Sequence, residues 1–84
     1  MDRNSAISKL KEIIRPFVKD QHMIATMTEE TDFINDLKIN SANLVDIVLD
    51  VEDAFEISID NESMERMLDV KSALEIIETK LADK

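Results

Sequence analysis

The chain has 84 residues, 19 acidic and 10 basic side chains, and a formal net charge of −9. This length suits one domain over residues 1–84 and leaves no room for a second hydrophobic core. The chain contains no cysteine, which excludes a disulfide framework and a thiolate metal site and fits a cytoplasmic location. Because no apolar run approaches the roughly 20 residues of a membrane span, we expect no membrane insertion.

The negative charge is concentrated in the middle of the chain. Between residues 28 and 69 there are 13 acidic side chains against only Lys38 and Arg66, a net charge of −11. Such a field repels nucleic acid and anionic membranes and attracts basic protein surfaces. We therefore expect protein partners with basic patches and no nucleic acid. The alternative is an acidic surface that only keeps a small protein hydrated.

The first segment is predicted to be an amphipathic helix. The chain has no glycine and a single proline, which argues against a β fold built on tight turns. Pro16 should kink or end this helix near Ile14 or Arg15, because its ring clashes with the carbonyl group of Glu12. Apolar side chains recur at three- and four-residue spacing, at Ile7, Leu10, Ile13, Ile14, Phe17 and Val18.

A polar connection is expected from about Asp20 to Asn40. A loop of this length is uncommon in so small a domain and is usually packed down or functional. It contains apolar side chains that could anchor it to the core, at Met23, Ile24, Met27, Phe33, Ile34, Leu37 and Ile39.

The clearest helical pattern runs from Ser41 to Phe55, with Asn40 as a favourable N-cap. Its apolar face is formed by Leu44, Ile47, Val48, Val51 and Phe55. The stretch from Ile57 to Asp60 should break the helix.

A short helical turn is expected over residues 61–67, after which Asp69 caps a final helix. The inner face of that helix is Val70, Ala73, Leu74, Ile77 and Leu81. The predicted fold is all-α: a small four-helix bundle of three main helices and one short helix, with a long loop between the first and second helices.

Residues able to perform catalysis are sparse, and we predict no enzymatic activity. His22 is the only histidine and has no histidine or cysteine partner at a metal-binding spacing. Without glycine there is no phosphate-cradling loop and no calcium-binding turn of the EF-hand kind. We therefore predict no catalytic residues and no metal site.

Ser41 is the residue most open to a functional interpretation. In the first turn of a helix, unpaired N–H groups and the positive end of the helix dipole favour a phosphate-bearing group. The residue types alone leave two interpretations open: Ser41 helps to cap the helix, or it is a site of attachment.

The residues from Asp32 to Val48, DFINDLKINSANLVDIV, resemble the signature of acyl carrier proteins, in which D-F-x-x-D-L-G-x-D-S-L precedes an acidic helix. The similarity extends over nearly the whole chain. The resemblance implies that a phosphopantetheinyl transferase esterifies Ser41 with 4′-phosphopantetheine from coenzyme A. The thiol of that arm would then carry acyl groups to acyl-transferring, condensing or ligating enzymes.

The resemblance also implies two further sets of residues. A docking surface for partner enzymes would comprise Asp36, Val45, Asp46, Leu49, Asp50, Glu52 and Asp53. A pocket for the acyl chain would be lined by Val48, Ile59, Met64, Leu68, Ala73 and Ile77. We expect a monomer.

Three residues depart from the family pattern. Asn40 replaces its aspartate, Ala42 replaces its leucine, and Lys38 replaces its glycine. These changes favour a specialised carrier with dedicated partners. An aminoacyl or peptidyl carrier and an unmodified acidic interaction module remain the alternatives.

Overall fold

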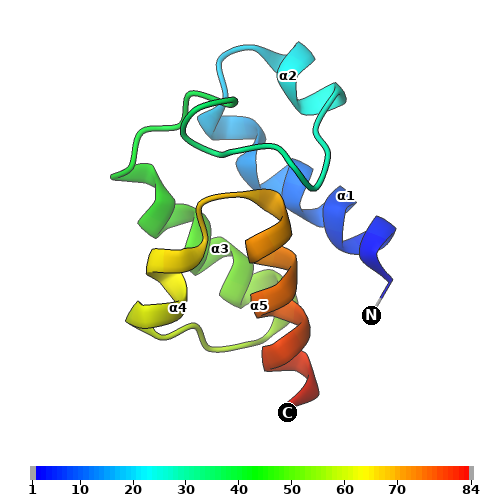
Figure 1. The fold of residues 1–84 in the computed structure, drawn as a ribbon, viewed down its shortest axis with the longest axis vertical. Helices are drawn as coiled ribbons and strands as arrows, with labels where there is room; N and C mark the ends of the chain where they lie inside the picture. Colours follow the sequence, from blue (N-terminus) through cyan, green and yellow to red (C-terminus); the bar gives the residue numbers. More distant parts are fainter. Residues whose placement is uncertain (1, 84) are drawn as a thin grey trace.

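The computed structural model describes residues 2–83, which form helices and contain no strand. The elements are α1 (Arg3–Ile14), the 3-10 helix η1 (Arg15–Phe17), α2 (Gln21–Ala25), α3 (Asn43–Phe55), α4 (Asn61–Arg66) and α5 (Val70–Ala82). Helix α1 packs against both α3 and α5, while α4 packs against α5 (Figure 1). The predicted all-α class and small helical bundle are confirmed.

The two ends of helix α1 are set by Asp2 and by Pro16. At its start, the carboxylate of Asp2 accepts a hydrogen bond from the backbone N–H of Asn4. At its end, Pro16 cannot continue a regular helix, so the chain tightens into η1 after Ile14. The predicted end of this helix is confirmed.

The connection from 20 to 40 contains a short helix that the sequence interpretation missed. Helix α2 is capped by Asp20, whose carboxylate accepts the backbone N–H of His22 at 3.0 Å. The expectation of a loop throughout this connection was therefore wrong for Gln21–Ala25. Its anchoring to the core is confirmed for five of the seven predicted anchors, because the side chains of Ile24, Met27, Phe33, Leu37 and Ile39 are buried. Met23 is only partly buried, and the expectation was wrong for Ile34, whose side chain is exposed.

Helix α3 buries the apolar face that its spacing predicts. Ile47, Val48, Val51 and Phe55 are buried, and Leu44 is partly buried against the same core. After Phe55, Glu56 adopts a left-handed conformation with φ of 55°, which ends the helix. The predicted break is confirmed.

The first turn of α5 is held by the connection between α1 and α3 (Figure 1). The backbone N–H of Val70 donates to the carbonyl oxygen of Thr31 at 3.0 Å, and that of Lys71 donates to Glu29 at 2.9 Å. Asp69 supplies the next acceptor, because its Oδ1 takes the N–H of Ser72 at 2.7 Å. The first three N–H groups of α5, which have no partner within the helix, are thereby satisfied.

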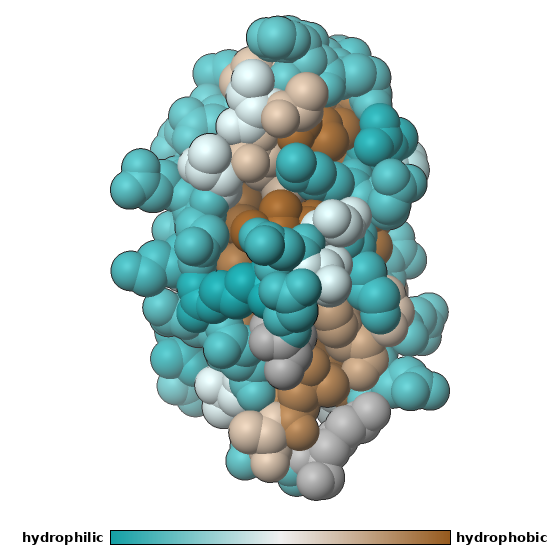
Figure 2. All heavy atoms as spheres, turned by 90° about the vertical axis from the view of Figure 1, so that its right-hand side faces the viewer, coloured by the Kyte–Doolittle hydropathy of each residue, from teal (hydrophilic) through white to brown (hydrophobic). Residues whose placement is uncertain are grey.

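Twenty buried apolar side chains, drawn from α1, α2, α3, α5 and the connections, form one hydrophobic core. Figure 2 shows the side of the molecule that lies at the right in Figure 1. Hydrophilic residues cover most of this face, and apolar residues show through in a band along its middle. None of the helices within residues 2–83 is long and apolar enough to cross a lipid bilayer.

We predict that Asp69→Ala lowers the free energy of unfolding by about 1 kcal/mol, as is typical for loss of an N-cap acceptor. The measurement is chemical denaturation followed by circular dichroism. Glu65→Ala is the matched control, because it removes an exposed carboxylate from α4 with no role in capping α5. Equal stability of the two variants would show that the Asp69 cap contributes nothing.

Candidate functional site

Ser41 lies exposed in a turn immediately before α3. Asn43 donates its backbone N–H to the carbonyl oxygen of Asn40 at 2.8 Å, and Leu44 donates to that of Ser41 at 3.2 Å. The side-chain oxygen of Asn40 accepts the N–H of Ala42 at 2.9 Å. Asn40 thus caps this turn, but regular helix begins at Asn43, two residues after the predicted start at Ser41.

The chain that leads to Ser41 is fixed by buried neighbours. Leu37 and Ile39 are each only 2% exposed, and the N–H of Ile39 donates to the carbonyl oxygen of Phe33 at 3.0 Å. Between them, Lys38 is exposed and adopts a left-handed conformation with φ of 59°. The result is a packed, hydrogen-bonded approach to an accessible hydroxyl group.

The local electrostatics suit a phosphate-bearing group on this hydroxyl. The first N–H groups of a helix carry partial positive charge, and the 13 residues of α3 provide an aligned helix dipole. An anion near the start of such a helix is stabilised by this dipole, even where the first N–H groups already have acceptors, as those of Ala42, Asn43 and Leu44 do. A phosphate ester at Ser41 is therefore compatible with its surroundings.

The exposed side of α3 combines apolar and acidic side chains. Val45 is 48% exposed and Leu49 is 54% exposed, which is unusual for large apolar side chains. Asp46, Asp50 and Asp53 are exposed on the same helix. Five of the seven predicted docking residues thus lie exposed on one helix.

The other two predicted docking residues also make hydrogen bonds within the fold. Asp36 accepts the backbone N–H of Asp32 on Oδ2 at 2.7 Å, which closes the turn before Lys38. Glu52 is half-buried, and its Oε2 accepts the backbone N–H of Ile59 at 2.7 Å. Glu52 therefore ties α3 to the connection that leads into α4, a role that residue type alone does not reveal.

The six predicted pocket residues differ in burial. Val48, Ala73 and Ile77 are buried, and Ile59 and Met64 are partly buried against the core. Leu68 is 46% exposed, in the segment between α4 and α5. The structure thus places five of the six in or against the core and leaves Leu68 at the surface.

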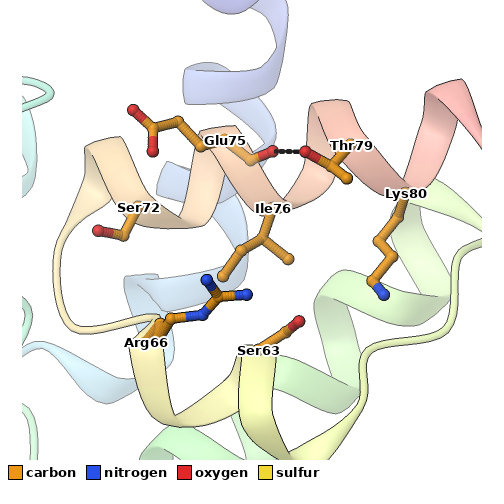
Figure 3. Close-up of a pocket in the computed structure, with 7 residues that line it drawn as sticks. All are labelled: Ser63, Arg66, Ser72, Glu75, Ile76, Thr79 and Lys80. Carbon is orange, nitrogen blue, oxygen red and sulfur yellow. Dashed lines mark hydrogen bonds between the residues drawn. The ribbon is translucent and has the colours of Figure 1, made fainter.

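A cavity of about 260 Å³ lies between α4 and α5, and none of the six predicted pocket residues lines it (Figure 3). Its lining residues are Ser63, Arg66, Ser72, Glu75, Ile76, Thr79 and Lys80. Beside it, Lys80 pairs with Asp60 at 3.3 Å. The Ser63 hydroxyl group, with Lys80, holds the pKa of the Asp60 carboxyl below its usual value. Sequence reasoning did not identify this cavity.

Two observations concern histidine and metal chemistry among residues 2–83. His22, the one histidine, is exposed on α2. Over the same range, no cluster of three or more histidine, cysteine, aspartate or glutamate side chains could hold a metal ion.

The chain is similar to several acyl carrier proteins. That of Coprothermobacter proteolyticus is 34% identical over 84 residues, the full length of both chains. That of Thermotoga maritima is 34% identical over 79 residues, covering 94% of this chain and 95% of the other. That of an Exiguobacterium species is 36% identical over 58 residues, covering 69% of this chain and 73% of the other. No family model matches.

Similarity at this level over the entire chain, together with the all-α bundle, identifies the family. This chain belongs to the acyl carrier protein family.

Proposed function

We propose that the protein carries acyl groups as thioesters on a 4′-phosphopantetheine arm attached to Ser41. It would deliver them to cytoplasmic enzymes of fatty-acid, polyketide or related biosynthesis. The proposal depends chiefly on one observation, the exposure of Ser41 in the turn that leads into α3. Membership of the acyl carrier protein family supports it.

Attachment of the arm would require a second protein. The residues on either side of Ser41, Asn40 and Ala42, carry no group that accepts a proton from its hydroxyl. A phosphopantetheinyl transferase would supply the base that takes the hydroxyl proton. The Ser41 oxygen would form the ester bond to the phosphate of the phosphopantetheine half of coenzyme A, the pyrophosphate bond would break, and adenosine 3′,5′-bisphosphate would leave. In this proposal the chain itself catalyses no step, and its contribution is to present the hydroxyl group on a hydrogen-bonded, accessible turn.

Partner enzymes would bind the exposed side of α3. Val45 and Leu49 offer apolar contact area, and Asp46, Asp50 and Asp53 add negative charge beside them on the same helix. Exposed apolar side chains rimmed by charges are typical of transient protein interfaces. Basic patches on the partners would be attracted by the acidic side chains, which mainly raises the rate of association.

The acyl chain would be sheltered by the buried residues Val48, Ala73 and Ile77. Ile59 and Met64 lie at the edge of this cluster, only partly buried. Methionine adapts its shape easily, so Met64 suits a position that must move when a chain enters. Exposed Leu68 would contact the chain only at its point of entry.

The first test is the attachment itself. After incubation with coenzyme A and a broad-specificity phosphopantetheinyl transferase, the intact mass should rise by one phosphopantetheine. Ser41→Ala should abolish the gain because it removes the only atom of that side chain that can form the ester. Ser58→Ala, which removes another exposed serine hydroxyl group, should leave it unchanged.

If the Ser41→Ala variant still gained the mass of one phosphopantetheine, the arm would be attached to another residue and the proposed site would be wrong. If wild type gains no mass while a control carrier is modified, and its native transferase also fails, the chain is the unmodified interaction module instead.

The second test concerns docking. Asp46→Lys and Asp50→Lys should each slow acyl transfer by a partner enzyme by roughly two- to fivefold at low salt, as expected for an exposed charge at an interface. The difference should shrink as salt screens the charges. Glu65→Lys is the matched control, because it makes the same change of charge on α4. Equal rates for all three variants and wild type would mean that the acidic side of α3 is only hydrated surface.

A further inference from the structure

Lys38 is held in a backbone conformation that lysine does not favour. Its φ of 59° lies in the left-handed region, where the Cβ of most residues clashes with the backbone. The only other non-glycine residue with positive φ within residues 2–83 is Glu56, at the end of α3, where such a conformation is common. Lys38 therefore stands out as a strained position in a loop.

The surrounding fold enforces this conformation. The flanking side chains of Leu37 and Ile39 are buried, and both residues donate backbone hydrogen bonds back to the preceding turn, to Asp32 at 3.1 Å and to Phe33 at 3.0 Å. Asparagine would adopt the same conformation with less strain. What lysine provides and asparagine does not is an exposed positive charge.

Lys38 is the one positively charged side chain in a long acidic part of the sequence. Between Asp20 and Glu65, Lys38 is the only lysine or arginine, among 13 acidic residues. It is also three residues from Ser41, so the two Cα atoms lie within about 11 Å of each other. A flexible four-carbon side chain carries its ammonium group.

We propose that Lys38 is a positioning residue for the arm: its ammonium group pairs with the phosphate of the group attached to Ser41. This inference depends on the proposed function, because the phosphate arrives only with the arm. The pair holds the first atoms of the arm against the turn before α3. It also offsets the repulsion between the new anion and the acidic surface around it.

The test compares the protein before and after attachment of the arm, with each state verified by intact mass. Wild type and Lys38→Arg keep the charge, whereas Lys38→Asn removes it and relieves the strain. Lys71→Asn is the matched control, because it removes an exposed lysine from α5. The measured quantity is the change in thermal midpoint on attachment, at low salt and in 1 M NaCl.

Attachment changes the thermal midpoint of each protein by some amount. We expect that change to be about 1 to 6 °C more positive in wild type, Lys38→Arg and Lys71→Asn than in Lys38→Asn. The difference should shrink in 1 M NaCl, where the screening length falls to about 3 Å. Before attachment, in 1 M NaCl where the lost charge matters least, Lys38→Asn should unfold at a higher temperature than wild type, because its backbone strain is smaller.

Equal shifts in all four proteins would overturn the pairing of Lys38 with the phosphate while leaving attachment at Ser41 intact. An unchanged midpoint for Lys38→Asn before attachment, in 1 M NaCl, would contradict the strain from which the inference begins. Failure of wild type to gain mass with any transferase would reject both this inference and the proposed function.

Discussion

The start of α5 is the point on which the arrangement of the other elements depends. Helix α5 contributes five buried side chains, yet a helix start placed inside a protein leaves N–H groups that must find acceptors. Those acceptors come from the connection between α1 and α3, through the carbonyl groups of Glu29 and Thr31. The same connection continues through buried Phe33 to Ser41. Satisfying one helix start therefore also fixes the approach to the candidate site.

This constraint explains why the long connection is ordered. Loops without secondary structure are rarely so long in a small domain. Here the stretch from Glu29 to Phe33 is hydrogen-bonded to the chain around the start of α5 at both of its ends. The carbonyl oxygen of Glu29 accepts the N–H of Lys71, and the N–H of Phe33 donates to the carbonyl oxygen of Leu68 at 3.0 Å. Buried Ile24 and Met27 add apolar contact on the side of α2.

Much of the fold could be predicted from apolar spacing and capping residues, as α3 and the Asp69 cap illustrate. Helix α2 was missed because its five residues bury only Ile24, which is too little to produce a periodic pattern. The contacts of Glu29 and Thr31 with α5 are invisible in sequence, because a backbone carbonyl group accepts a hydrogen bond whatever its side chain. At the site, residue types left Ser41 open between a cap and an attachment point, and only the family resemblance suggested the arm.

The hydrogen bond between Glu52 and Ile59 has a consequence for the proposed docking of partners. The Glu52 carboxylate lies on the acidic helix and holds the backbone of Ile59, a partly buried residue of the next connection. In the proposed docking, a basic side chain of a partner that took Oε2 of this carboxylate would compete with the Ile59 N–H for that oxygen. Binding of the partner and loosening of the α3–α4 connection would then be thermodynamically linked, and linkage is reciprocal. Cargo that displaces Ile59 from inside would, by the same free energy, make Glu52 more available to a partner outside.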